Sequence, residues 1–467
     1  MERVLPKTLD YTDVLPLAVE SRSRRRTFFP VNGATFSSDG ANIIRIDLSA
    51  DALLDTQHSY LRFDFSATAG TSCGIDTAGG HAFIRRIRVE QSGTILEDIN
   101  SYNRLMGGVV LPCQSGSDHH NERSITEHIR GAGQLDDLAV GTTLITQYQA
   151  DANSNASQAL IQGQHHNSSA QLDVGETATF SIPLNTGLLN NDKLLPLMLM
   201  SAPLTIEIEL APSIQPVIYA AVNGTYSISN VRYIANLIEV GQDVAGQLRM
   251  VQEMSGGVLT LAGQTYRHFT GTLSNGTGDQ VVNVPARVKS MKSIFFCSSG
   301  TGNDRTLYDV SYGGNMSLDN YQLKIGSVVY PATPVQCRFA DGDPDKTGVV
   351  LRRSEALMEL AKAWGNVGST KGLGQLRGTN YAVAKDQADK AGSSGTVVYA
   401  PFGMDLEAFQ RVAIESGVNT ADRSLPISLV LGFDGANGPE DNTQLEVYVL
   451  ADALFYINGD GSMSVSV

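Results

Sequence analysis

The sequence lacks any apolar run long enough to cross a membrane as a helix. Its longest run covers residues 194–200 and is interrupted by Pro196, whereas a spanning helix needs about 20 apolar residues. The first residues, MERVLPKTLDYTD, contain no apolar core of the kind found in a secretory signal peptide. We therefore expect a protein that is made inside the cell and is not secreted through a signal peptide.

Cysteine is scarce, and no two cysteines form a CxxC pair. The four residues lie far apart, at Cys73, Cys113, Cys297 and Cys337. Such spacing gives neither a disulfide framework nor a zinc site. We interpret them as reduced thiols that are mostly buried, and we predict no metal and no other cofactor.

Charged residues are also few, at 18%, below the roughly 25% of an average globular chain. Acidic residues outnumber basic ones by 48 to 34, so the net charge is −14, and such a surface repels nucleic-acid phosphates. The exception is the run SRSRRR, which contains Arg22, Arg24, Arg25 and Arg26. A solvated basic arm explains this run, and the functional alternative is contact with the phosphates of a genome or of lipid headgroups.

What the sequence does contain is strand-like alternation of apolar and polar residues, together with 46 glycines suited to many turns. Strands are predicted at 42–48, 60–65, 83–89, 177–184, 204–210, 226–240, 281–297, 321–330, 427–433 and 445–457. Helices are few: the best runs from 354 to 364 and ends in the only tryptophan, and weaker ones are predicted at 96–106 and 405–412. The predicted fold class is all-β, with a few short helices in the loops between strands.

The chain divides into two similar halves near residues 212–224. Each half has a series of strands, one good helical segment and one long segment without periodicity, at 113–171 and 365–396. We therefore predict three units: a basic arm at 1–28, a first sandwich at 29–216 and a second sandwich at 217–467. Loops of such length usually form functional surfaces.

Clusters of polar residues give no catalytic constellation. The histidines of DHHNE at 118–122 and the pair at 165–166 lack the HExxH spacing of a zinc site, so polar loops are predicted there. Asp341, Asp343 and Asp345 alternate as in a calcium loop, but the loop glycine and the closing glutamate are missing, which favours an acidic turn.

Two further patterns are equally weak as signs of an enzyme. The glycine-rich residues 365–378 do not match a phosphate-binding loop. Glu207 and Glu209 share one face of a strand, and paired carboxylates can hydrolyse glycosides, but an exposed strand face explains them more simply. The sequence therefore indicates a structural or binding protein and not an enzyme.

Several segments, in order along both halves, resemble the double jelly-roll major capsid proteins of DNA viruses. They are 84–102 (IRRIRVEQSGTILEDINSY), 194–200 followed by 204–210 (LLPLMLM and LTIEIEL), 321–335 (YQLKIGSVVYPATPV), 403–407 with 416–420 (GMDLE and SGVNT), and 454–467. The segment at 321–335 and those that follow resemble the members found in Polinton-like viruses and virophages.

The resemblance implies two consecutive eight-stranded jelly rolls per chain, a homotrimeric capsomer of pseudo-sixfold outline and an icosahedral shell around a DNA genome. The implied location is the virion. The implied partners are further copies of the chain, penton and minor capsid proteins, and DNA or an inner membrane facing Arg22 to Arg26. The alternatives are a carbohydrate-binding or adhesive β-sandwich surface protein, a jelly-roll glycoside hydrolase, and a minor capsid component with a single roll.

Overall fold

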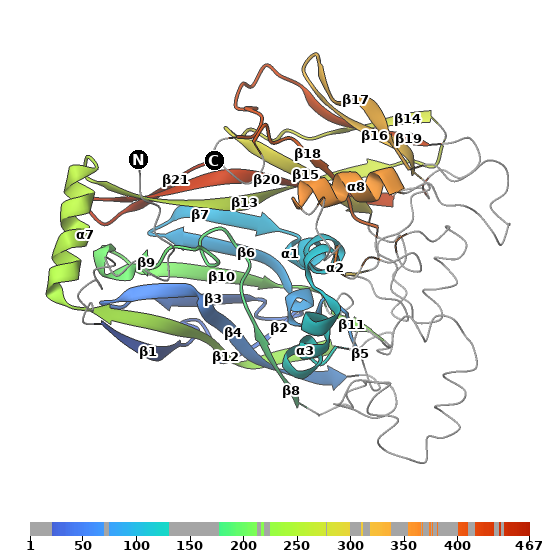
Figure 1. Ribbon diagram of the computed structural model, residues 1–467. Coiled ribbons are helices and arrows are strands. Elements are labelled where there is room, and N and C mark those ends of the chain that lie inside the picture. The colour runs from blue at the N-terminus through green and yellow to red at the C-terminus, as the bar shows by residue number, and fades with distance from the viewer. Residues whose placement is uncertain are drawn as a thin grey trace, which may run out of the picture.

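The computed structural model describes two β-sandwiches, whose four main sheets lie one above another (Figure 1). It describes residues 21–69, 74–129, 177–212, 216–218, 225–276, 278–298, 310–311, 318–337, 354–365, 400–409, 416–433 and 443–467, and residues 367, 373, 374, 376, 381 and 439. Within these ranges every strand pair is antiparallel.

The first sandwich has two sheets, with strand orders β1-β12-β4-β8 and β3-β10-β6-β7 in the described residues. Its main strands are β1 (Ser21–Phe28), β3 (Ile43–Leu48), β4 (Leu53–Ala69), β6 (Ile84–Gln91), β7 (Thr94–Asn100), β8 (Thr177–Ile182), β10 (Leu204–Leu210) and β12 (Thr225–Val240). The short β2 (Thr35–Ser37) and β9 (Leu195–Pro196) extend the first sheet, and β5 (Gly74–Ile75) pairs with β11 (Val217–Ile218).

The second sandwich has the orders β13-β20-β15-β18 and β14-β19-β16-β17 in the described residues. Its strands are β13 (Val258–Leu273), β14 (Gly278–Asn283), β15 (Met291–Ser298), β16 (Leu318–Ile325), β17 (Val328–Gln336), β18 (Phe402–Asp405), β19 (Ile427–Phe433) and β20 (Thr443–Asn458). The short C-terminal β21 (Met463–Ser466) pairs with β20.

Both sandwiches have one topology. If the main strands of each are numbered along the chain, the sheets read 1-8-3-6 and 2-7-4-5 in both. This order is that of a jelly roll, in which two Greek keys close into a two-sheet sandwich. The predicted fold class, two consecutive eight-stranded jelly-roll sandwiches with short helices in the loops, is confirmed.

The predicted unit boundaries do not follow the strand pairing. β1 lies in the predicted arm 1–28 and β12 in the predicted second unit 217–467, yet they pair from Ser21 opposite Val240 to Phe28 opposite Tyr233. A strand belongs to the sheet whose hydrogen bonds it completes. We therefore propose a first roll of residues 21–240 and a second of residues 258–458.

Helices fall between the fifth and sixth strands of each roll. The first roll carries α1 (Tyr102–Arg104), the π-helical η3 (Leu105–Val110), α2 (Leu111–Gln114) and α3 (Ser117–Glu127) there, and the second carries α8 (Ser354–Ala363). The other helices in the described residues are α7 (Gln242–Met254), which joins the rolls, and the short η2 (Gly79–Phe83) and η4 (Leu197–Leu199). The predicted helix at 354–364 is confirmed by α8.

Three predictions of local structure are wrong. The helix predicted at 96–106 is wrong for residues 96–100, which belong to β7 because the Ser92-Gly93 turn, with both residues at positive φ, folds them back onto β6; residues 102–106 are helical, in α1 and η3. Residues 117–127 form α3 and not a loop. Asp405 ends β18, so no helix begins there, and residues 410–412 lie outside the described ranges.

One apolar cluster joins the two rolls. It contains first-roll core residues such as Phe63 and Phe180 together with Phe295, Tyr448 and Phe455 of the second roll. A separate cluster, which includes Phe296 and Phe402, lies between the two sheets of the second roll. The sheet of β13, β20 and β15 therefore packs on both of its faces.

Buried polar contacts fix the same joint. The Gln91 side chain donates to Gly461 O at 3.1 Å and accepts from the Met463 N–H at 2.6 Å. The Tyr448 hydroxyl donates to Ser101 O at 2.9 Å. The Gln91 amide also donates to Ala202 O within the first roll, but separating the rolls would leave the Met463 N–H and the Tyr448 hydroxyl without these partners.

Candidate interaction surfaces

The four arginines of the basic run lie on β1, an edge strand of the first roll. Their side chains are exposed along one border of the sheet. Arg24 Nη1 lies 3.1 Å from Glu239 Oε1, Arg25 donates to the Tyr60 hydroxyl at 3.3 Å, and the Arg26 guanidinium stacks 4.8 Å from the Phe28 ring centre. Charge on an edge strand also discourages pairing with another sheet. Contact of Arg22, Arg24, Arg25 and Arg26 with genome or lipid stays a prediction.

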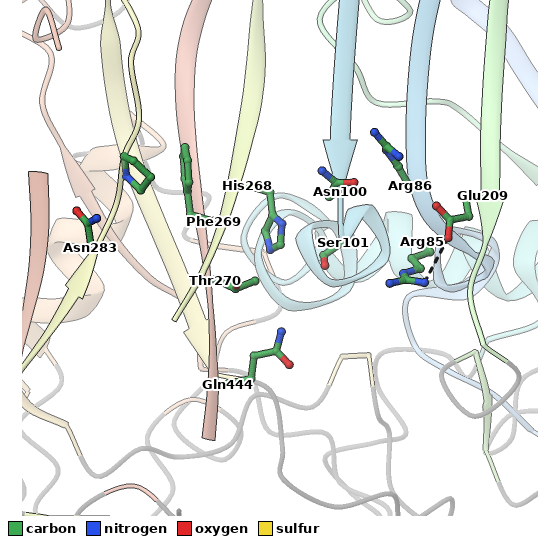
Figure 2. A pocket seen from close by; sticks show the side chains of 11 residues that line it. Arg85, Arg86, Asn100, Ser101, Glu209, His268, Phe269, Thr270, Asn283 and Gln444 are labelled. Atoms are coloured by element: carbon green, nitrogen blue, oxygen red, sulfur yellow. Dashed lines mark hydrogen bonds and ion pairs between the residues drawn. The ribbon is translucent and has the colours of Figure 1, made fainter. Parts of the chain in front are cut away.

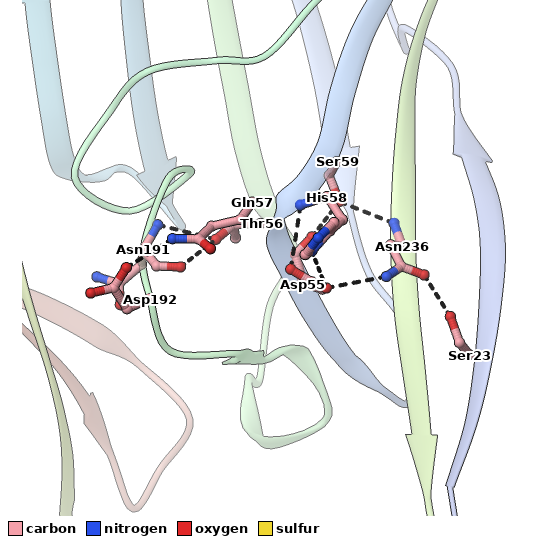
Figure 3. A network of polar contacts seen from close by, with 9 residues as sticks. All are labelled: Ser23, Asp55, Thr56, Gln57, His58, Ser59, Asn191, Asp192 and Asn236. Carbon is pink, nitrogen blue, oxygen red and sulfur yellow. Dashed lines mark hydrogen bonds and ion pairs between the residues drawn. The ribbon is translucent and has the colours of Figure 1, made fainter. Parts of the chain in front are cut away.

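A polar network fixes β1 to its neighbours (Figure 3). Ser23 Oγ donates to Asn236 Oδ1 at 2.7 Å, and the Asn236 amide donates to Asp55 Oδ2 at 3.2 Å. Asp55 also contacts His58 Nδ1 at 2.8 Å, while Ser59 Oγ donates to the Asp55 carbonyl at 2.5 Å. Neither serine hydroxyl bonds the His58 ring, so the network holds strands together and does not form a Ser-His-Asp triad.

A buried ion pair, and not an apolar stripe, anchors α3. Arg123 Nε lies 2.7 Å from Glu127 Oε1, and the Gly80 N–H donates to Glu127 Oε2 at 2.9 Å. Burial opposes ionisation of Glu127, but the charge and hydrogen bond of Arg123 outweigh it and lower the pKa of this carboxyl. Nearby, burial lowers the pKa of His81 to about 4.

The segment DHHNE thus lies on α3. Of its side chains, the structure describes His119, whose Nδ1 lies 2.8 Å from Ser115 Oγ, and the exposed Glu122. In the described part of the chain no group of three His, Cys, Asp or Glu residues could hold a metal ion. The histidine pair at 165–166 and the acidic run at 341–345 lie outside the described residues, as does most of 365–378.

The paired glutamates belong to a ladder of charges on the outer face of the β3-β10-β6-β7 sheet. Glu207 contacts Arg45 Nη2 at 2.7 Å and Arg88 Nη1 at 3.5 Å, and Glu209 contacts Arg85 Nη1 at 3.2 Å. Both carboxylates therefore have arginine partners, whereas a glycosidase needs one protonated carboxylic acid. The ladder suits a sheet face better than a hydrolytic site.

A polar cleft of about 720 Å³ lies between the rolls (Figure 2). Arg85, Glu209 and Ser101 line it from the first roll, and His268 and Gln444 from the second. The charged groups have partners within the chain, because Arg85 pairs with Glu209, and the His268 ring contacts the buried Glu446. The cleft lies between the two rolls and is lined mainly by polar residues. These residues suggest no catalytic nucleophile and no acid–base pair.

Large apolar side chains are exposed together in two regions, between β1 and β3 and on α7. Phe29, Val31 and Ile43 lie where the chain passes from β1 to β3, and the Val31 N–H donates to Arg45 O at 2.8 Å there. Met250, Val251 and Met254 lie on α7. Exposed apolar groups of this kind often mark contact surfaces. Among the described residues, none of the helices has the length and apolar character to cross a bilayer.

The three cysteines in the described residues agree with the prediction of buried thiols. Cys113, Cys297 and Cys337 are buried thiols, and burial raises the pKa of the Cys297 thiol to about 12. Cys73 lies outside the described residues. Trp364, predicted as a packing residue, stacks on Phe295 with ring centres 4.6 Å apart.

The chain is similar to known proteins in structure but not in sequence. No protein-family model matches the chain, and no curated protein matches it in sequence. The chain is similar to VP54 of the virus PBCV-1, as fitted into a reconstruction of the virophage Sputnik, with a TM-score of 0.59 and 10% identity over 98% of this chain and 99% of VP54.

Two further solved structures agree with this result. The Faustovirus major capsid protein has a TM-score of 0.58 and 9% identity, over 96% of this chain and 92% of that protein. A chain in the structure of the Sputnik virophage has a TM-score of 0.53 and 10% identity, over 100% of this chain and 92% of that one. The fold is therefore the double jelly roll of viral major capsid proteins, as the sequence resemblance implied.

Proposed function

We propose that the chain is the major capsid protein of a DNA virus, a homotrimer that tiles an icosahedral shell. The observation that carries the proposal is the repetition of one eight-strand topology in two rolls fused through a common core. Three such chains contribute six rolls of the same topology, which gives a trimer a pseudo-sixfold outline. The likeness to viral major capsid proteins over the whole length supports it.

The apolar patch of Phe29, Val31 and Ile43 is the proposed contact of one copy with the next. A three-fold ring is heterologous, so each chain must present two different surfaces. Val281, exposed on the edge strand β14 of the second roll, offers an apolar group of matching character. Contacts between capsomers, and with penton and minor capsid proteins, belong to the same proposal, as does a location in the virion.

Light scattering on the purified chain tests the trimer. We expect about 150 kDa, three times 49.9 kDa, with no dissociation on dilution. Replacing both Phe29 and Val31 by Asp should return the mass to that of one chain, whereas Ile125→Asp, at an exposed apolar residue on α3, should not. A stable monomer of the unaltered chain would contradict the proposal and favour a binding module.

The alternatives have no specific support. The glycoside hydrolase needs a free carboxylic acid beside a carboxylate, and Glu207 and Glu209 are paired with arginines. The carbohydrate-binding sandwich and the minor component with a single roll do not account for two fused rolls. We propose a structural, non-enzymatic role, with Arg22, Arg24, Arg25 and Arg26 facing genome or lipid.

A further inference from the structure

The second roll buries a lysine between two carboxylates. Lys292 is 7% exposed, and its Nζ lies 2.7 Å from Glu407 Oε1 and 3.4 Å from Asp452 Oδ1. Asp452 is 6% exposed, and the Glu407 side chain is 12% exposed. Removing charged groups from water costs free energy that a buried ion pair recovers only in part. Stability alone is therefore a weak reason for this cluster.

Three adjacent strands bring the charged groups together. β15 carries Lys292, its neighbour β20 carries Asp452, and Glu407 follows the end of β18, the other neighbour of β15, by two residues (Figure 1). The register of β15 against β20 shifts between Met291 and Ser293. Lys292 is the extra residue at this bulge, and a bulge re-aims the side chain that it carries. The sheet itself therefore sets the lysine against the two carboxylates.

The backbone and a serine hydroxyl hold the Asp452 carboxyl group in place. Ser290 Oγ donates to Asp452 Oδ2 at 2.7 Å, and the Asp452 N–H donates to Ser290 O at 3.1 Å. The Gly417 N–H in turn donates to Ser290 Oγ at 3.1 Å. One oxygen of the carboxyl group thus faces the lysine, while the other accepts from a fixed hydroxyl. Such a donor stabilises the negative charge that forms on an oxygen when a nucleophile adds to the carboxyl carbon.

We propose that Lys292 and Asp452 join in an intramolecular amide bond, with Glu407 as the proton carrier. Glu407 takes a proton from the ammonium group of Lys292, and the free amine attacks Cγ of Asp452. Oδ1 then leaves as water, with the two protons that the nitrogen gives up and that Glu407 carries across in turn. One C–N bond forms, one C–O bond breaks, and nothing is oxidised or reduced.

Proximity supplies the driving arrangement for this step. Groups that are held about 3–3.5 Å apart in a fixed orientation react far faster than the same groups free in solution. Proton transfer by a positioned carboxylate adds to this effect, and the Nζ to Oε1 distance of 2.7 Å is within its reach. The reaction therefore needs no further reactant.

The bond would join the third and eighth strands of the second roll. A covalent link between residues far apart in the sequence restricts the unfolded chain and so favours the folded one. The inference goes beyond the proposed function and does not depend on it, because the bond would form within one chain whether or not that chain enters a shell.

Mass spectrometry of the denatured full chain tests the bond. We expect an intact mass lower by one water molecule than the mass that the sequence gives. Trypsin should fail to cut after Lys292, and the digest should contain a branched peptide in which residues 290–305 are joined to residues 424–467. Fragmentation of this peptide should place the link at Lys292 and Asp452.

Matched variants separate the reaction from a simple ion pair. Lys292→Arg keeps the positive charge but replaces the amine by a guanidinium that stays protonated, so it should restore the full mass. Glu407→Gln leaves both joined residues in place and should lower the branched peptide at least about tenfold. Lys289→Arg, at an exposed lysine whose Nζ donates to Ser466 Oγ at 2.9 Å, should still lose the water.

Two results would overturn the inference. The unaltered chain could have the full mass of its sequence, which would show an ion pair only. The loss of water could persist in Lys292→Arg, which would place it at other residues. Branched peptide in Glu407→Gln at the level of the unaltered chain would refute the role of Glu407. Circular dichroism checks that the variants fold, and the mass of the unaltered chain decides the matter even if one of them does not.

Discussion

The third strands of the two rolls occupy the same place in the topology but differ in burial. In β4, Leu61, Phe63 and Phe65 point into the first roll and are buried, while Arg62 and Ser66 on the other face are partly exposed and Asp64 between them is 8% exposed. In β15, MKSIFFCS, all eight residues are buried. Topology therefore does not set the burial pattern of a strand; the layer that packs on its second face does.

That second layer is built from the helical insertions of both rolls. Trp364, after α8, stacks on Phe295, and Cys113 of α2 belongs to the same apolar cluster. Gly374 approaches the backbone of Pro112 so closely that a Cβ there would lie 2.7 Å from its carbonyl oxygen. Equivalent insertions thus meet in one place, where they cover the face of β15 that points away from the core of the second roll.

The adjacent residues Phe295 and Phe296 allow this difference between the two rolls to be tested. Phe295 faces the cluster between the rolls and Phe296 the core of the second roll, and both are fully buried. Replacing either by Ala should cost about 3–5 kcal/mol in the free energy of unfolding. Only Phe295→Ala should separate urea unfolding into two transitions, because it removes packing shared by the rolls.

Urea unfolding followed by near-UV and far-UV circular dichroism measures this. Phe296→Ala is the control, with the same loss of volume on the opposite face of the strand. A single transition in Phe295→Ala, with the midpoint of Phe296→Ala, would show that the rolls are coupled by contacts other than this cluster.

The same difference explains what the sequence could predict. Alternating strands such as β3 and β10 were predicted nearly at their observed bounds, because one face meets solvent, whereas only residues 60–65 of the longer β4 were predicted. The apolar run at 281–297 was predicted as one segment, but Pro285 and its neighbours separate β14 from β15. Strand β13 was missed because Gly263 and Gly271 interrupt its pattern; a Cβ at Gly263 would lie 2.8 Å from Gly187 O.

Helices were harder to predict because their anchors are not apolar stripes. α3 is held by the ion pair of Arg123 and Glu127, and α7 leaves Met250 and Met254 in solvent, so the apolar residues of these helices do not mark a buried face. The arginines of β1 were recognised as basic, but their place on an edge strand depends on β12, more than two hundred residues away. Non-local pairing of this kind leaves no signal in a local pattern.

Acid should affect the first roll before the second, because His81 and Glu127 belong to it. Burial holds the pKa of His81 near 4, below its ordinary 6.5, with Glu127 raising it and Arg123 and His119 lowering it. Between these values the unfolded chain binds the proton and the folded chain does not, so stability falls as pH falls from 6.5 toward 4. The loss should reach about 3 kcal/mol.

Urea midpoints across this pH range measure the effect. His81→Phe should remove most of the slope above pH 4, and what remains at lower pH should follow Glu127, whose lowered pKa means that its contribution is lost as it becomes protonated. If His81→Phe leaves the slope as it was, the acid sensitivity arises elsewhere.

The smallest effect is expected on the charged face of the β3-β10-β6-β7 sheet. Arg86 holds Asp98 there through two hydrogen bonds, of 2.7 and 2.5 Å, and both side chains are partly exposed. Because both side chains keep some contact with water, Asp98→Asn should cost only about 1 kcal/mol, less at high salt. A double-mutant cycle with Arg86→Gln, read by urea unfolding of the isolated chain, isolates the coupling. A coupling as large as the effect of Phe295→Ala would show that this face is as dry as β15, and the contrast between the two rolls would then be wrong.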